Sequence, residues 1–156
     1  MTTSNLPTAT HTRAEFRDLT FDESHAILER HNVGRIAYPI NDGVDIQPIH
    51  YVCDDAWVYA RTSRGHKFAA LANNSLCAFE VDEVRGLFDW ESVVIKGKLE
   101  LLDPLLASQD AYSRGLELMR ALVPDTFTDL DPAPHRSILF RFRASDMTGR
   151  SSRSAS

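Results

Sequence analysis

The sequence predicts a mainly β protein, a closed or partly closed antiparallel barrel with helices at its periphery. Three observations predict this class. About six segments have the composition of strands, most connections between them are short, and the regular alternation of strands and helices that parallel sheets require is absent. At 156 residues the chain is long enough for one domain with a core and too short for a second independent domain.

The two ends of the chain differ in composition from its middle. Residues 1–12 are rich in Thr, Ser and small residues, and the end TGRSSRSAS is rich in Ser. Such segments cannot bury enough apolar surface to become ordered. We therefore expect a disordered arm over residues 1–12, a single domain over 13–146 and a disordered tail over 147–156.

The first half of the domain reads as a helix followed by three strands. Thr20 and Glu23 form a capping box, and Gly34 can end the helix. The turn sequences NDG and DD separate the strands, so tight turns should join them as an antiparallel meander. These three strands are expected over residues 35–40, 44–52 and 56–62.

The second half alternates between helices and longer strands. We expect a helix over residues 64–73, strands over 75–83 and 90–102, and a last strand over 136–144. Asp103 should cap a further helix with Pro104 at its first position. The inward residues are expected to be Val93, Ile95, Leu99 and Leu101 in the long strand, Ile138, Phe140 and Phe142 in the last strand, and Leu105, Tyr112, Leu116, Met119 and Leu122 on the helix.

Charge and composition exclude several classes of function. A net charge of -5 argues against non-specific nucleic-acid binding, which needs a basic face. No apolar run approaches the roughly 20 residues that span a bilayer, and no secretory signal opens the sequence, so we expect a cytoplasmic protein. Cys53 and Cys77 lie in apolar strand-like segments and read as small buried hydrophobic residues, and the six His show no metal-ligand spacing.

One basic cluster stands out in this acidic chain. The stretch RTSRGHK contains Arg61, Arg64, His66 and Lys67, and no Asp or Glu occurs over residues 56–79. Here a strand should end and a helix should begin, with Thr62 or Ser63 as the N-cap. The free N–H groups at a helix start bind phosphate well, and Lys67 lies one turn further on.

Two interpretations of this cluster stay open. The residues form either a phosphate site or an ordinary helix cap among solvated surface charges. If phosphate binds, the neighbouring strands supply apolar and aromatic residues suited to a flat ring, namely Pro48, His50, Tyr51, Tyr59 and Trp90. A phosphorylated aromatic cofactor would then be the ligand.

The order of four sequence stretches is similar to a known family. VGRIAY, IQPIHYV, VYARTSRGHKFAALANNSLCAFEVDE and WESVVIKGKLELL resemble the pyridoxamine 5'-phosphate oxidase-like flavin-binding split barrels, especially the branch of nitroimidazole-resistance proteins. The resemblance runs from about residue 19 to residue 142. It implies a six-stranded split barrel that forms a homodimer, with FMN in two equivalent clefts at the interface.

The resemblance also implies roles for individual residues. The phosphate would be held by Thr62, Ser63 and Lys67, with Arg61 as a further ligand. The isoalloxazine ring would lie along the backbone of Pro48, Ile49, His50 and Tyr51. From the partner subunit, the long strand would reach the ring with Trp90, Ser92 and Val93.

In one respect the chain departs from true pyridoxamine phosphate oxidases. Those enzymes carry a C-terminal Arg-containing segment that grips the substrate phosphate, whereas here LFRFRASDMTGR leads into a Ser-rich tail. Pyridoxamine phosphate oxidation is therefore not expected.

Three functions remain possible for such a barrel. The first is an FMN oxidoreductase that reduces a small electrophile, such as a nitro-compound or quinone, with NAD(P)H. The second is a non-catalytic flavin-binding or flavin-sequestering protein, and the third is a haem- or deazaflavin-binding barrel. A flavin supplies its own redox chemistry, so a catalytic base is not required. His50 is the one candidate to donate a proton or orient a substrate, and the simpler alternative is a partly buried strand residue.

Overall fold

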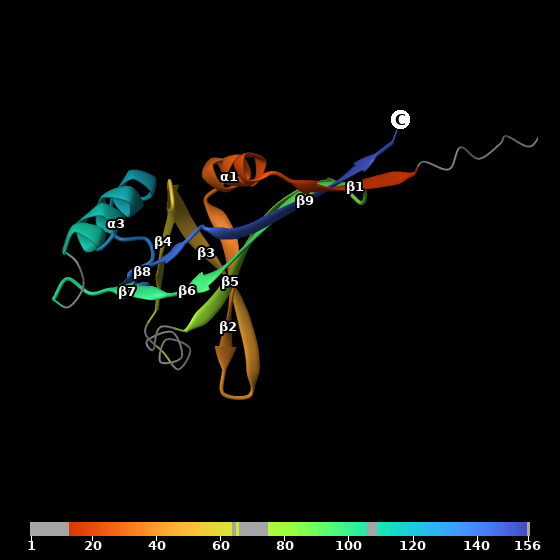
Figure 1. The fold of residues 1–156 in the computed structure, drawn as a ribbon. Helices are drawn as coiled ribbons and strands as arrows, with labels where there is room; N and C mark the ends of the chain where they lie inside the picture. Colours follow the sequence, from red (N-terminus) through yellow and green to blue (C-terminus); the bar gives the residue numbers. More distant parts are fainter. Residues whose placement is uncertain (1–12, 64, 66–74, 106–108, 156) are drawn as a thin grey trace, which may run out of the picture.

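Strands dominate the computed structural model, which describes residues 13–63, 65, 75–105 and 109–155 (Figure 1). The two described helices are α1 (Phe21–Arg30) and α3 (Gln109–Leu122). The strands are β1 (Ala14–Leu19), β2 (Val33–Ile40), β3 (Gly43–Asp54), β4 (Trp57–Thr62), β5 (Leu76–Gly86), β6 (Asp89–Lys98), β7 (Glu100–Leu102), β8 (Ile138–Arg143) and β9 (Asp146–Ser154). Every pairing between them is antiparallel.

The strands form one sheet in the order β1-β9-β6-β5-β2-β3-β4-β8-β7. Only Leu99 separates β6 from β7, so the two act as one long bent strand. This bent strand pairs with β5 through β6 and with β8 through β7. The sheet therefore closes on itself as a barrel of six members: β2, β3, β4, β5, β6–β7 and β8.

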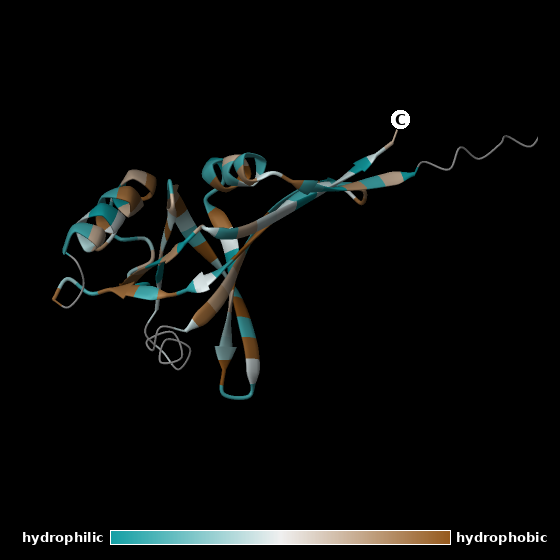
Figure 2. Ribbon diagram, viewed as in Figure 1, coloured by the Kyte–Doolittle hydropathy of each residue, from teal (hydrophilic) through white to brown (hydrophobic). Residues whose placement is uncertain are grey.

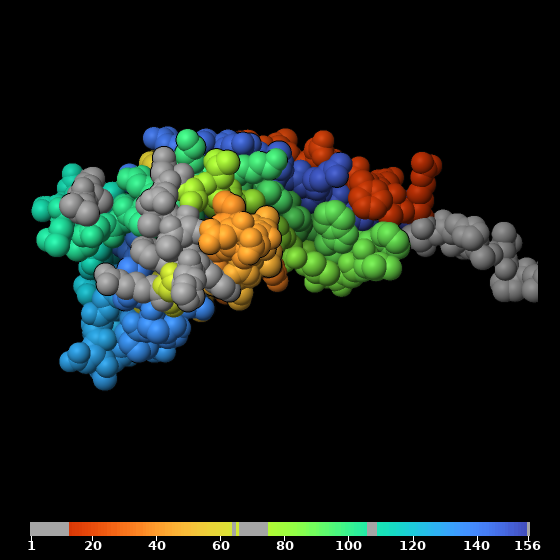
Figure 3. All heavy atoms as spheres, turned by 90° about the horizontal axis from the view of Figure 1, so that it is seen from below, coloured from red at the N-terminus to blue at the C-terminus, as the bar shows by residue number. Residues whose placement is uncertain are grey.

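A part of the sheet projects beyond the barrel and is called the arm below. It consists of β1, β9 and the adjoining ends of β5 and β6 around residues 83–92 (Figure 1). β9 pairs with β6 on one side and with β1 on the other, which lengthens the sheet beyond the ring. Figure 3 shows β1 (red) beside the turn between β5 and β6 (green), at the end of the molecule away from α3. The arm keeps apolar side chains on its surface, including Phe16 (64% exposed) and Leu87 (82% exposed).

The barrel interior is the main hydrophobic core. Apolar and polar residues alternate along β2 and β3 in Figure 2, because successive side chains point to opposite faces, although in the first half of β3 the apolar Val44 and Ile46 are on the exposed face. Tyr51, Phe79 and Phe142 form a run of ring contacts with centroids 5.0 and 5.2 Å apart. From α1, Ile27 and Leu28 pack into the same core, and the Tyr51 hydroxyl donates a hydrogen bond of 2.6 Å to the Leu28 carbonyl. Helix α1 is thereby fixed against the barrel.

A second, smaller core lies under α3. Ala111, Gly115 and Met119 are the buried residues of the helix, and Tyr59 and Leu139 are their contacts on β4 and β8. The close approach depends on Gly115, since a Cβ there would lie 2.8 Å from Tyr59 Cδ1. The outer face of these two strands is therefore covered by α3.

Much of the predicted secondary structure is confirmed. The capping box of α1 is present: the Glu23 N–H donates to Thr20 Oγ1 at 3.2 Å, and the Thr20 N–H donates to Glu23 at 2.8 Å. Of the predicted inward residues, Val93, Ile95, Leu99, Phe140 and Phe142 lie in the barrel core and Leu101 packs against it, whereas Ile138 is half-buried and outside the core.

The predicted tail over residues 147–156 is wrong. β9 occupies Asp146–Ser154, and its Ser151 and Ser152 are 3% and 0% exposed. β9 is an inner strand with neighbours on both sides. The composition resembles a disordered tail, yet the burial comes from pairing with β1 and β6. Strand β1 was also not predicted, and the described strands number nine where six were expected.

The helix after Asp103 differs from its prediction. The Leu105 N–H donates to Asp103 Oδ1 at 2.8 Å, but these residues form a turn, and α3 is described from Gln109. Leu105 is 89% exposed and therefore does not belong to the buried face of the helix. The helix predicted over residues 64–73 and the arm over 1–12 lie outside the described residues.

Neither described helix combines the length and the apolar character needed to cross a membrane.

Candidate functional site

Strands β3 and β4 part along their length. They pair only from Tyr51 to Asp54 on β3, whereas β3 pairs with β2 from Gly43 to His50. β4 continues to Thr62, paired with β8 instead. The β3 edge over residues 43–50 that turns away from β2 thus has no strand partner in the described chain. Such an edge can offer backbone groups to a ligand, although the Ile46 N–H already donates to Asp45 Oδ1 at 2.9 Å.

This open edge contains the segment predicted to lie along a ring. Ile49 and Tyr51 are 2% and 0% exposed, and their side chains fill the barrel. Their side chains are therefore closed to a ligand, and the Tyr51 backbone N–H and C=O are already hydrogen-bonded to Asn32, at 2.9 and 3.3 Å. Pro48 and His50 alternate with them and are exposed on the outer face.

His50 is not the partly buried residue of the simpler interpretation. Its side chain is exposed, and among the described residues it has no hydrogen-bond partner. Its Cα lies opposite that of Val33 on β2. The imidazole is therefore accessible to a small molecule at this edge, while the structure shows no group that orients it.

The predicted phosphate residues are described in part. Thr62 ends β4 and is 7% exposed, and Ser63 follows it at intermediate exposure. Both lie where β4 has left β3, next to the open edge. Arg64, His66 and Lys67 fall outside the described residues.

Arg61 is occupied by a buried ion pair. Two guanidinium nitrogens, Nη1 and Nη2, donate to the Asp131 carboxylate at 2.5 and 2.9 Å, and the two side chains are 5% and 2% exposed. The carboxylate also accepts from the Phe127 N–H at 2.8 Å and the Ala133 N–H at 2.9 Å. The Arg61 hydrogen bonds, followed by these backbone donors, hold the pKa of Asp131 well below its ordinary value. Arg61 thus anchors the loop around residue 131 to β4, and we do not retain it as a phosphate ligand.

The three β6 residues predicted to reach a ring differ in exposure. Val93 is 1% exposed and belongs to the core, and its strand is paired there with β5 on one side and β9 on the other, so its backbone is also enclosed within the sheet. Trp90 and Ser92 are partly exposed on the arm. The Trp90 ring meets the edge of Phe16 with centroids 6.2 Å apart, and the Ser92 hydroxyl donates to Glu80 Oε1 at 3.2 Å. The three residues therefore do not join the β3 edge through their own side chains within one protomer.

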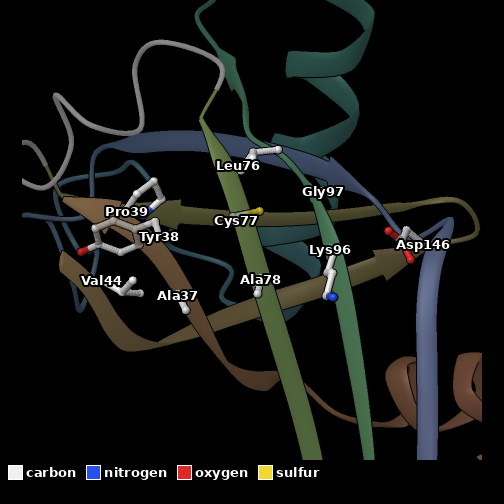
Figure 4. Close-up of a pocket in the computed structure, with 10 residues that line it drawn as sticks. All are labelled: Ala37, Tyr38, Pro39, Val44, Leu76, Cys77, Ala78, Lys96, Gly97 and Asp146. Carbon is white, nitrogen blue, oxygen red and sulfur yellow. The ribbon is translucent and has the colours of Figure 1, made fainter. Parts of the chain in front are cut away.

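A groove of about 550 Å³ crosses the outer face of the sheet (Figure 4). Pro39, Tyr38 and Val44 lie at one end and Lys96 and Asp146 at the other. Between them are Ala37, Leu76, Cys77, Ala78 and Gly97, so small and apolar residues form the floor. The size and the mainly apolar lining are those of a small-molecule site.

Sequence reasoning missed this groove. Alternation along β6 places Lys96 on the face away from the core, so its outward position could have been predicted from the sequence. Asp146 could not, because it lies opposite Lys96 only through the β6–β9 ladder, which was not predicted.

Apolar side chains surround the groove on the same outer face. Val44 is 73%, Ile46 62% and Leu76 65% exposed. Neither described helix packs its buried residues there: those of α1 face the barrel core and those of α3 face β4 and β8. A surface of this kind is typical of an interface or a ligand site.

Comparison with known families identifies the chain. A family model described as pyridoxamine 5'-phosphate oxidase matches residues 20–151. The chain belongs to the pyridoxamine 5'-phosphate oxidase family. The predicted resemblance to this family is therefore confirmed, although a search of curated proteins found no significant match.

Solved structures support the same assignment. The chain is similar to an FAD-binding protein from Mesorhizobium loti, with 26% identity, a TM-score of 0.70, and coverage of 90% of this chain and 99% of the other. It is similar to a candidate pyridoxamine 5'-phosphate oxidase from Corynebacterium glutamicum, with 26% identity, a TM-score of 0.65, and coverage of 90% and 100%. A candidate 5-nitroimidazole antibiotic resistance protein from Bacteroides thetaiotaomicron shares the fold at 17% identity, a TM-score of 0.66 and 88% coverage of each chain. The split-barrel fold class is thereby confirmed.

Proposed function

We propose that this chain binds FMN and acts as a flavin-dependent oxidoreductase. The observation that carries the proposal is the open edge of β3, which runs beside the end of β4 at Thr62 and Ser63. A phosphorylated flat ring needs hydroxyl donors for its phosphate, backbone groups for its polar atoms and an apolar surface for its face. The donors, the edge and the apolar outer face supply all three.

The similar proteins support the flavin. The Mesorhizobium loti protein is an FAD-binding protein, and this chain covers nearly all of it. We favour FMN because the phosphate cluster predicted from RTSRGHK suits a single phosphate at the end of the ribityl chain. Bound flavin supplies hydride and electron transfer. The chain's own residues bind and orient it, and His50 is the exposed candidate for contact with a substrate.

The substrate that we propose is a small electrophile such as a nitro-compound or quinone, with NAD(P)H as donor. Pyridoxamine phosphate oxidation remains unexpected from the sequence, and in the structure the β9 arginines lie beside carboxylates of neighbouring strands. Arg150 Nε lies 3.2 Å from Asp18, and Arg153 lies 2.7 Å from Asp89 and 3.1 Å from Glu91. Both are therefore engaged on the arm. We also retain the cytoplasmic location as a prediction from the sequence.

The visible spectrum tests the proposal. The purified protein, or apoprotein to which FMN is added, should show the two-band absorption of bound flavin, with tighter binding of FMN than of FAD. Anaerobic NADH or NADPH should then bleach it. A yellow protein that no nicotinamide bleaches would favour the non-catalytic flavin-binding role. A sharp haem band, or no band after FMN is added, would contradict the flavin assignment itself.

We further propose that the chain works as a homodimer with the flavin at the interface. The exposed Val44, Ile46 and Leu76 lie on the uncovered outer face, and burying them would favour association by about 25 cal/mol per Å². Ile46→Glu should shift the sedimentation of a dimer toward the monomer. Leu130→Glu, at a residue 77% exposed in the loop between α3 and β8, is the control. A wild-type chain that sediments as a monomer with FMN bound would contradict the dimer.

A further inference from the structure

At the charged end of the groove, two opposite charges stand side by side without forming an ion pair. Lys96 on β6 and Asp146 on β9 are Cα partners in the β6–β9 ladder, and both line the groove. In the part of the chain that the structure describes, neither side chain forms an ion pair or a hydrogen bond. Oppositely charged neighbours across a ladder commonly attract one another. Here an ammonium donor and a carboxylate acceptor stand side by side and both face the groove (Figure 4).

The rest of the groove sets the shape of the ligand. Ala37 and Ala78 are paired across β2 and β5, and Ala78 is paired in turn with Lys96 across β5 and β6. These three positions form a level row over three neighbouring strands. Two small side chains leave a flat apolar surface, and the row ends at the charged pair. A flat ligand with one polar edge fits this surface, whereas a free ion would leave the apolar part uncovered.

The two charges also specify the polar edge. The Lys96 ammonium can only donate hydrogen bonds, and the Asp146 carboxylate accepts them. The matching edge carries an acceptor next to a donor. An imide, in which an N–H stands between two carbonyl groups, has that pattern, and the pyrimidine ring of a flavin ends in such an edge.

We propose that Lys96 and Asp146 bind the imide edge of the flavin ring, with Asp146 accepting from the ring N3–H and Lys96 donating to a neighbouring carbonyl oxygen. This inference rests on the proposed function and deepens it. It lays the ring across β5 and β2 toward Ile46, which is two residues from Pro48 on the same face of β3. Asp146 on β9 lies three strand spacings, about 14 Å, from β2, and Lys96 on β6 lies two, about 10 Å, so a three-ring system over β5 and β2 can reach both side chains.

The test uses FMN and FMN methylated at N3, which lacks the imide donor but keeps the phosphate. Wild-type apoprotein should bind the methylated form about tenfold or more weakly, measured by quenching of flavin fluorescence. In Asp146→Ala the two forms should bind equally, because the acceptor is gone. Lys98→Met, two residues along β6 at an exposed position outside the groove, should keep the wild-type discrimination.

Lys96 has its own readout. A positive charge beside the carbonyl stabilises the negative charge of the reduced ring. Lys96→Met should therefore lower the reduction potential of bound FMN, and Lys98→Met should not. Wild-type protein that binds both FMN forms equally, or discrimination that survives Asp146→Ala, would overturn the inference while leaving flavin binding intact. A wild-type chain that binds neither form would instead overturn the proposed function. A third outcome would also overturn the inference. If only the dimer discriminates against methylated FMN, and Asp146→Ala also abolishes the dimer, then a second copy of the chain occupies the groove.

Discussion

Gly149 shows how closely α1 approaches β9. A Cβ at this position would lie 2.2 Å from Ser24 Oγ and 2.9 Å from Leu19 Cβ, so part of the structure would have to move. We expect Gly149→Ala to reduce the free energy of unfolding by about 1–3 kcal/mol, as overpacking commonly does. Urea denaturation gives the value. At Gly86 the nearest atom to an added Cβ is 3.8 Å away, so Gly86→Ala is the matched control, and an equal effect of the two changes would contradict the packing argument.

The buried ion pair of Arg61 and Asp131 stabilises the fold through two single residues. Removing one partner leaves the other charge buried alone, so Arg61→Leu should cost about 3–5 kcal/mol of unfolding free energy. The double variant with Asp131→Leu should cost less than the sum of the single variants, which a double-mutant cycle by urea denaturation measures. If the costs are small and additive while FMN binding falls, Arg61 holds the ligand rather than the loop.

Ser63 is the described residue through which the phosphate site can be tested. Its hydroxyl would donate to a charged phosphate, so Ser63→Ala should weaken FMN binding about tenfold. Riboflavin lacks the phosphate and should bind wild type and variant alike. Ser113→Ala on the exposed face of α3 is the control. Equal losses for FMN and riboflavin would move Ser63 out of the phosphate site.

Among the elements, α1 is tied to the arm by ion pairs that depend on pH. Glu83 on β5 meets Arg30 Nε at 2.5 Å and His31 Nε2 at 2.6 Å, at the end of the helix. The hydrogen bond from Arg30, then that from His31, lowers the pKa of Glu83 to about 2, although its partial burial opposes this. The carboxylate is 18% exposed, so solvent screens the pairs only in part.

The sign of the pH effect follows from this lowered pKa. The folded protein holds Glu83 ionised below its ordinary pKa of 4.5, so the contribution to stability is complete above that pH and is lost as the pH falls toward 2. We expect the urea midpoint to fall between pH 4.5 and pH 2. Glu83→Gln should make that fall shallower, and a pH dependence equal to wild type would show that other groups cause the acid sensitivity.

At the scale of the whole molecule, β9 connects the barrel to the arm. It is paired with Trp90 to Lys96 of β6, and its residues Gly149 to Ser154 are paired with β1, so its removal would leave two unpaired edges. A chain ending after residue 145 should lose cooperative unfolding or aggregate, as followed by circular dichroism and sedimentation. A chain ending after residue 154 keeps every β9 pair and is the control. Folding of the shorter chain to a stable barrel would show that the arm is independent of it.

The features that could be predicted from the sequence are those that depend on residues close together in the chain. The capping box of Thr20 and Glu23, the alternation that buries Phe140 and Phe142, and the turns between β2, β3 and β4 were all predicted, because each involves neighbours in the chain. The backbone role of Ile49 and Tyr51 came from the family resemblance and stays a prediction, and the Tyr51 backbone groups are hydrogen-bonded to Asn32 within the protomer.

The sequence alone determined the class of fold and the family, since local periodicity and the order of strand segments are properties of the sequence itself. Only the tertiary structure decided where Arg61 and Lys96 point: one is held by Asp131, 70 positions away, and the other faces a groove beside Asp146. The tertiary structure also showed that the serine-rich segment predicted as a tail is an inner strand. The physical reason is that a strand's edges are satisfied by partners far along the chain, so its composition cannot say whether it is paired on none, one or both of them.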